Sequence, residues 1–293
     1  MTRRQFKQLA QFNRFFVSSE FSVSYRRAKQ IQWQSQATSG YSLLAVLNGQ
    51  LAYTLDDKPV ELRASEFVLF QPNVSITANA KGAELLFLTF SAALVVQHAE
   101  AMHLTPPKST VAFKAGPLQR DQKLANVFGE IVAELTSEKP GQEIVMNALV
   151  EQLMVHLLRS YAQPRRSDEL ELSRVGLVDR RIRRSVELMH TQLDQDLTLK
   201  ALAAESYLSP FHFARLFKKL TGSTPHNYLA GIRAARAQLL LAETELSVTQ
   251  IGARVGYLSA SHFTKAFRLA TGTTPREFRK ALISRNSTSA NER

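Results

Sequence analysis

The spacing of hydrophobic and polar positions changes along this chain, and the change divides it into parts. Between residues 21 and 90, short runs of apolar and β-branched residues alternate with turn residues, which predicts β-strands. Asn48-Gly49 interrupts the longest run, Tyr41 to Leu55, and predicts a hairpin there, while Lys81-Gly82 separates two later runs. Several short strands at this spacing predict a small β-barrel or sandwich.

Residues 118–162 instead have the spacing of amphipathic helices, and Lys139-Pro140-Gly141 divides the segment in two. The apolar face of the first helix consists of Leu124, Val127, Phe128, Ile131, Val132 and Leu135. The second helix runs from about Gln142 to Tyr161 and carries a wide apolar face. A helical pair of this kind either covers the barrel or forms a dimer interface, and the sequence leaves both uses open.

The segment from Gln163 to Ser173 is polar, contains Pro164 and lacks periodicity, so it predicts an interdomain linker. Beyond it, helix start and stop signals follow one another closely enough for seven helices. Thr224-Pro225 and Thr274-Pro275 each place an N-cap residue before a first-turn proline. We therefore expect an N-terminal domain over residues 1–162, a linker over 163–174, a helical domain over 175–284 and a disordered tail over 285–293.

Two stretches of the helical part repeat each other fifty residues apart. Ten of the 22 positions from 207 to 228 are identical to those from 257 to 278. Each copy places a basic helix after a shorter one and a tight connection, which is the arrangement of a helix-turn-helix. For one isolated copy, a solvated basic face would be the simpler interpretation. Because the same start and stop residues surround the basic helix in both copies, the duplication favours a ligand with two equivalent faces, such as duplex DNA.

Helical spacing separates an inward from an outward face in each copy. Phe213 and Phe217 in the first copy, and Phe263 and Phe267 in the second, face a core. The outward residues, which are the candidate DNA contacts, are Phe211, His212, Ala214, Arg215, Lys218, Lys219, Ala260, Ser261, His262, Thr264, Lys265 and Arg268. Arg215 and Lys265 occupy equivalent places and suit guanine O6 and N7, whereas Lys218, Lys219 and Arg268 lie one turn further on and suit phosphates.

The charge distribution supports a polyanionic partner for the helical part. The net charge is +12, and residues 174–293 hold 19 Lys and Arg against 9 Asp and Glu, whereas residues 1–173 hold 18 against 16. The chain contains no cysteine, which excludes disulfides, thiolate zinc sites and a cysteine nucleophile. His212 and His262 lack a third ligand at suitable spacing, so we expect no metal. No apolar run with a cleavage site follows the basic N-terminus, and we expect neither a signal peptide nor a membrane span.

The residues of the second copy resemble the AraC/XylS family of bacterial transcription regulators. The resemblance rests on Ile251 to Tyr257, His262 to Phe267 and Thr271 to Phe278, and residues 228–243 are similar to the long helix that joins two helix-turn-helix units in that family. Two positions depart from the family pattern. Gly252 stands where alanine is usual, and Tyr207 replaces the small residue of the first turn. Upstream of Tyr207, Leu202 aligns with Ile251 at an offset of 49 instead of 50, so the two turns differ by one residue.

The N-terminal part is similar to the cupin-like sensor domain that many members of this family carry. Metal-binding cupins need a histidine pair on the barrel strands, and the first histidine here is His98, which argues against a metal-dependent cupin enzyme. A barrel interior would hold a small effector, and the aromatic residues suited to line it are Trp33, Tyr41, Tyr53 and Phe87. The alternative for each of these aromatics is an ordinary place in the barrel core.

These observations predict an α+β multidomain protein, with a cupin-like β-barrel and two helices followed by an all-α domain of seven helices. The resemblance implies a cytoplasmic, sequence-specific transcription regulator that binds double-stranded DNA as a homodimer, needs no cofactor and is not an enzyme. The further partners are RNA polymerase and an effector, and a regulatory protein in place of a small molecule remains the alternative effector.

Overall fold

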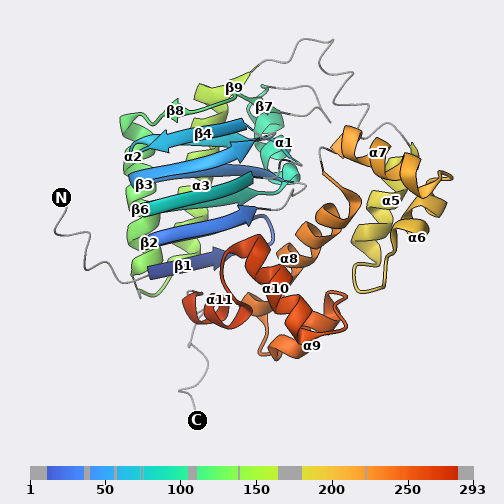
Figure 1. Cartoon of the computed structure of the whole chain (residues 1–293). Helices are drawn as coiled ribbons and strands as arrows, with labels where there is room; N and C mark the ends of the chain where they lie inside the picture. The colour runs from blue at the N-terminus through green and yellow to red at the C-terminus, as the bar shows by residue number, and fades with distance from the viewer. Residues whose placement is uncertain are drawn as a thin grey trace.

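The computed structural model describes residues 12–35, 40–55, 58–72, 74, 76–104, 111–137, 139–163, 180–221 and 223–282. The C-terminal tail expected from the sequence lies outside these residues, as does the expected interdomain linker apart from Gln163. Figure 1 shows a β-sheet backed by helices in the N-terminal half and a group of helices in the C-terminal half. Among the described residues, no helix combines the length and apolarity that a membrane crossing requires.

The N-terminal half is built on an antiparallel sheet whose pairing runs in the order β1-β2-β6-β3-β5-β8, with β4 paired to β3. Its strands are β1 (Phe12–Val17), β2 (Phe21–Ser35), β3 (Tyr41–Leu55), β4 (Lys58–Arg63), β5 (Glu66–Phe70), β6 (Ile76–Phe90) and β8 (Leu118–Gln119). A second, two-stranded sheet pairs β7 (Ala112–Phe113) with β9 (Ala162–Gln163). The β-rich N-terminal domain predicted from the sequence is confirmed.

The hairpin expected at Asn48-Gly49 is wrong, because β3 continues through this point. The pairing of β3 with β6 shifts register around Asn48, as in a β-bulge, and Gly49 takes a positive φ of 81°. Gly82 on β6 also has a positive φ, 61°, and a Cβ on Gly49 would lie 2.4 Å from the Gly82 carbonyl oxygen. The glycines expected to end strands therefore let two long strands pass close together and bend.

The sheet is buried on both faces, which explains the unbroken apolar run near the start of β3. Leu43 and Ala45 belong to the core between the sheet and the helices, whereas Leu44 and Val46 point into a second core on the opposite face. The helices of the first core are α1 (Ala92–Ala101), α2 (Gln122–Thr136) and α3 (Gln142–Tyr161). The predicted helical pair thus covers the sheet with its wide apolar face.

Seven helices make up the described C-terminal part, the number expected from the sequence. They are α5 (Arg180–Thr191), α6 (Leu199–Glu205), α7 (Pro210–Thr221), α8 (Pro225–Glu243), α9 (Val248–Arg254), α10 (Ala260–Thr271) and α11 (Pro275–Ala281). One core centres on Phe213 and Phe217, the other on Phe263 and Phe267. Helix α8 has 19 residues, so it is about 28 Å long, and it joins the two helix-turn-helix units.

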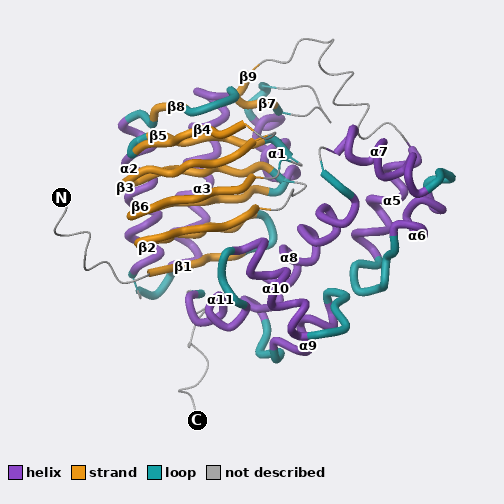
Figure 2. Tube along the Cα trace, in the orientation of Figure 1, coloured by secondary structure: helices purple, strands orange, loops and turns teal. Residues whose placement is uncertain are grey.

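The edge strand β1 contributes side chains to the core of the second helix-turn-helix unit, and Figure 2 shows this strand beside α10 and α11. Phe15 and Val17 are buried there, and the Phe15 ring lies 4.4 Å from the Phe278 ring between centroids. Arg26 on β2 donates a hydrogen bond to the carbonyl oxygen of Thr271 at the end of α10. The two halves of the protein therefore share a packed interface.

Candidate nucleic-acid interface

The two recognition helices, α7 and α10, are built alike. Their sequence of buried, half-buried and exposed positions is the same at all 12 positions. Each helix buries two phenylalanines one turn apart, with ring centroids separated by 5.4 Å in α7 and 5.7 Å in α10. These buried rings anchor the inner face, so the outer face of each helix has the same orientation relative to its own core.

The same set of hydrogen bonds ends both helices. The hydroxyl of Thr221 donates to the Phe217 carbonyl at 2.8 Å and also lies 3.1 Å from the Ser223 carbonyl. Thr271 repeats these contacts at 2.8 Å and 3.1 Å, with the carbonyls of Phe267 and Thr273. Both threonines are buried, so their hydroxyls satisfy the helix end without water. The shared Thr-Gly-x-Thr-Pro motif therefore specifies how each recognition helix joins the next helix.

The two turns that precede the recognition helices differ by one residue, as the sequence comparison predicts. The left-handed position is Tyr207 in the first turn, with φ of 54°, and Gly256 in the second, with φ of 83°. The next amide closes each turn, from Leu208 to the Ala203 carbonyl at 3.0 Å and from Tyr257 to the Gly252 carbonyl at 2.9 Å. The additional residue of the second turn, Leu258, is fully exposed.

Ten of the twelve candidate DNA contacts are exposed, and Ala214 and Thr264 are half-buried. The exposed residues are Phe211, His212, Arg215, Lys218, Lys219, Ala260, Ser261, His262, Lys265 and Arg268. Phe211 is 79% exposed, so its ring is accessible to a ligand. The two helices thus present basic and apolar side chains outward in equivalent places.

The basic side chains of these faces are available to a polyanion. Within the described residues, no ion pair engages Arg215, Lys218, Lys219 or Lys265. Lys218 and Lys219 lie in the last turn of α7, where the helix dipole favours positive charge. No group of His, Cys, Asp or Glu in the described part of the chain has the arrangement of a metal site.

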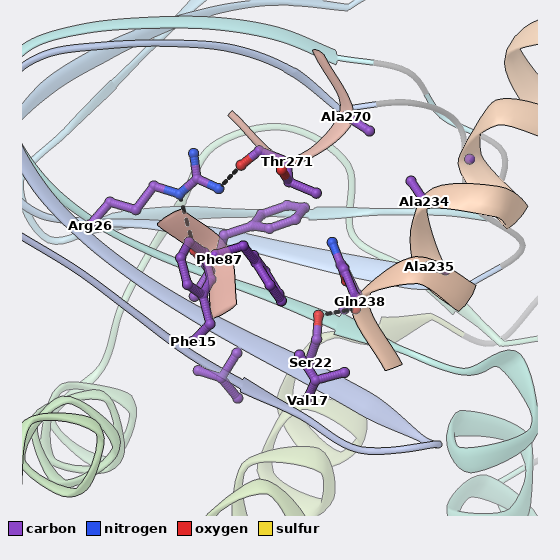
Figure 3. Close-up of a pocket in the computed structure, with 15 residues that line it drawn as sticks. Phe15, Val17, Ser22, Arg26, Phe87, Ala234, Ala235, Gln238, Ala270 and Thr271 are labelled. Carbon is purple, nitrogen blue, oxygen red and sulfur yellow. Dashed lines mark hydrogen bonds between the residues drawn. The ribbon is translucent and has the colours of Figure 1, made fainter. Parts of the chain in front are cut away.

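A cavity of about 90 Å³ lies between the two halves of the protein, and Figure 3 shows side chains of both halves around it. Phe15, Ser22, Arg26 and Phe87 line it from the sheet, and Gln238 from α8. Sequence reasoning missed Arg26, because nothing in its local pattern distinguishes it from the half-buried Arg27 beside it. Burial lowers the pKa of the Arg26 guanidinium to about 10, which still leaves it charged at neutral pH.

Three of the four aromatics expected to line an effector pocket, Tyr41, Tyr53 and Phe87, lie in different parts of the structure. Tyr41 lies in the core between sheet and helices and donates to the Val111 carbonyl at 2.7 Å, whereas Tyr53 packs on the opposite face. Phe87 lines the interdomain cavity. The side chain of Trp33 lies outside the described part of the chain. A second depression of about 340 Å³ is lined mostly by exposed residues of β2, β3, β4 and β6.

Comparisons with known proteins agree with this architecture. Residues 202–281 match a family model described as a helix-turn-helix domain, and residues 106–163 match one described as a cupin. The chain is 12% identical to ToxT from Vibrio cholerae, with a TM-score of 0.58 over 90% of this chain and 98% of that one. At this identity, the likeness shows the fold alone.

Curated relatives match the C-terminal part. The transcriptional regulator MtrA of Neisseria gonorrhoeae is 32% identical over 125 residues, which is 42% of each protein. The arabinose operon regulatory protein of Escherichia coli is 26% identical over 133 residues, 45% of this chain and 42% of that protein. The aligned part therefore spans less than half the length of either relative. The C-terminal part is therefore similar to the helix-turn-helix domains of bacterial regulators of transcription, and residues 106–163 are similar to a cupin.

Proposed function

We propose that this protein is a sequence-specific DNA-binding regulator of transcription. The observation that carries the proposal is the pair of recognition helices with matched burial, exposed basic side chains and a shared joining helix. A helix of this size fits the major groove, and two of them on one rigid connection suit successive segments of one DNA face, about 34 Å apart. Their exposed stripes differ in sequence, so the two halves of the DNA site differ as well.

The outward residues divide into base readers and phosphate contacts. Arg215 and Lys265 lie at equivalent places on the two helices and suit the O6 and N7 acceptors of guanine, each contact contributing about 1–3 kcal/mol of discrimination. Lys218, Lys219 and Arg268 lie one turn further along and suit phosphates, which add affinity without sequence preference. Phe211 suits the methyl group of thymine.

Selection of bound sequences from a random DNA pool, followed by binding assays over a range of salt concentrations, tests this division. Arg215→Ala or Lys265→Ala should reduce the preference for the selected sequence. Lys218→Ala or Lys219→Ala should weaken binding to every sequence and lower the slope of log K against log salt by about one. Equal losses on selected and random DNA for all four variants would refute the assignment.

We further propose that two copies associate through α3. Its outer side leaves Ile144 75% exposed and Val145 42% exposed, although its other side is packed on the sheet. An Ile144→Glu change should shift the sedimentation coefficient from dimer to monomer, while the same charge at an exposed place on β6, in Asn79→Glu, should not. Monomeric wild-type protein at micromolar concentration would contradict this interface.

The effector site that we propose is the interdomain cavity. A structure of ToxT has been solved with an unsaturated fatty acid bound, and a charged guanidinium lines the cavity here, so a carboxylate is the expected ligand class. Its volume of about 90 Å³ is far below the roughly 300–1,000 Å³ of typical ligand pockets, so only a short carboxylate fits without separating the domains. Carboxylates should raise the melting temperature more than amides of equal length. The alternative of a protein effector is not favoured.

The remaining parts of the proposal follow from regulation of transcription itself. A regulator bound beside a promoter acts on RNA polymerase, which is therefore its proposed further partner. A bacterial regulator of this kind works where the chromosome lies, in the cytoplasm. Reporter fusions to the selected DNA site, compared in cells with and without the gene, test both statements together.

A further inference from the structure

Three separate segments of the helical part meet at one side chain, Arg233 in the middle of α8. Its Nε donates to the carbonyl oxygen of Leu193 at 2.9 Å, and its Nη2 donates to that of Gln195 at 2.7 Å. The guanidinium also lies 5.2 Å from the centre of the Tyr257 ring. Leu193 and Gln195 belong to the loop between α5 and α6 of the first unit, whereas Tyr257 belongs to the turn before α10 of the second.

The packing around this guanidinium leaves little room for another arrangement. Leu193 directs its side chain against the core of the second unit, although its backbone belongs to the first. Gly256 has a positive φ of 83°, and a Cβ there would lie 2.5 Å from both the Leu193 carbonyl oxygen and Nη2 of Arg233. A glycine at this place therefore allows the two units to touch through their backbones.

Short connections link this contact to both recognition helices. Tyr257 packs on Phe263 of α10, with ring centroids 5.6 Å apart. On the other side, the loop that holds Gln195 continues to Thr198, whose hydroxyl caps α6, and α6 packs on α7. Burial lowers the pKa of Arg233, while Tyr257 and the carboxylates of Asp196 and Asp194 oppose this effect and favour the charged form.

We propose that Arg233 is a positioning residue that sets the angle and distance between the two recognition helices, and with them the spacing of the two DNA half-sites. The inference rests on the proposed DNA-binding function. A single helix such as α8 sets the distance between its ends but leaves each unit free to pivot about its own connection. The fork of the guanidinium removes this freedom because it binds two carbonyls of one unit and stacks on a ring of the other. Lysine offers a single ammonium and cannot reproduce that geometry.

The angle between the units can be measured without DNA. Because the chain has no cysteine, spin labels can be attached to a Lys219→Cys, Leu269→Cys pair, at equivalent exposed places on α7 and α10. Electron paramagnetic resonance then gives the distribution of distances between the labels. We expect a narrow distribution in the parent protein and in Arg236→Ala, which removes an exposed arginine of the same helix. Arg233→Lys and Arg233→Ala should broaden or displace it at temperatures where circular dichroism shows the helices intact.

Binding to the selected DNA site with one base pair inserted or deleted between its halves is the second measurement. The parent and Arg236→Ala should lose at least about tenfold in affinity when the spacing changes, since one misplaced contact of 1.4 kcal/mol suffices. Arg233→Lys should bind the site with the original spacing more weakly, and its affinities for the original and the altered spacing should differ less. The inference would be overturned if Arg233→Ala changed neither the distribution of label distances nor the ratio of affinities for the original and the altered spacing. If no DNA sequence were selected by the parent protein, the proposed DNA-binding function would be refuted instead. The label measurement would still show whether Arg233 sets the angle between the two units.

Discussion

Truncation of Phe15 tests whether the edge strand of the sheet belongs to the core of the helical domain. Phe15 is 3% exposed and packs on Phe278, while its neighbour Phe16 is 5% exposed and points into the core between the sheet and α2 and α3. Replacement of a buried phenylalanine by alanine costs about 3–5 kcal/mol. Phe15→Ala and Phe16→Ala therefore remove the same side chain at similar burial, one residue apart, from opposite faces of one strand.

The two variants should differ in which helices unfold locally more often. A loss of about 4 kcal/mol raises the population of open states by nearly three orders of magnitude, since each 1.4 kcal/mol is a factor of ten. Hydrogen exchange followed by mass spectrometry should therefore show faster exchange of peptides from α10 and α11 in Phe15→Ala, and of peptides from α2 and α3 in Phe16→Ala. If Phe15→Ala leaves α10 and α11 as protected as in the parent, the shared core is refuted.

Three further predictions test individual contacts. Gly256→Ala and Gly141→Ala both place alanine at a positive φ, 83° and 84°. Nothing lies within 4 Å of the new Cβ at Gly141, whereas the Cβ at Gly256 meets backbone and Arg233. In urea denaturation, Gly256→Ala should therefore lower the free energy of unfolding by about 1–3 kcal/mol more than Gly141→Ala does. Hydrogen bonds from the Thr274 amide and hydroxyl hold the pKa of Glu277 below its usual value. The stabilisation that ionised Glu277 contributes is therefore complete above the unfolded pKa of about 4.3 and is lost as the pH falls through the folded pKa. The difference in unfolding free energy between the parent and Glu277→Gln should shrink over the same pH range. Thr271→Val removes the hydroxyl at the end of α10, and Thr221→Val removes the equivalent hydroxyl of α7. Each change should lower the free energy of unfolding by about 1–2 kcal/mol. Hydrogen exchange should become faster only at the end of the helix that carries the change.

The helical half could be predicted from the sequence because each of its features has a local signal. Period, caps and turn residues lie within a few positions of the structure that they specify. Thr224 and Thr274, for example, cap their helices as the Thr-Pro pairs predict. The one-residue difference between the turns was visible as well, since the apolar positions before them align at a different offset from those after them. Duplication strengthened every one of these signals by repeating it.

The remaining structure depends on contacts between distant segments, which leave no local signal. Asn48-Gly49 has the composition of a hairpin, but pairing with β6 on both sides keeps the strand continuous and turns the glycine into a bulge. Strand β1 was not predicted, because a run of buried residues that faces two different cores has no alternation. Tyr41 and Tyr53 are both apolar enough to line a pocket, and only the sheet decides that they point in opposite directions.

These contacts make the two recognition helices unequal in how they are held. Helix α10 is bound to the sheet through Phe15, Arg26 and the core that they share, so it moves with the N-terminal domain. Helix α7 packs within the first unit, whose described links to the second are α8, the side chain of Leu193 and the Arg233 contacts. Through the described contacts, a change in the N-terminal domain therefore reaches α10 directly and α7 by way of this joint. An effector bound in the proposed interdomain site, which α8 and α10 both line, would therefore act on the relative placement of the two helices rather than on the surface of either one.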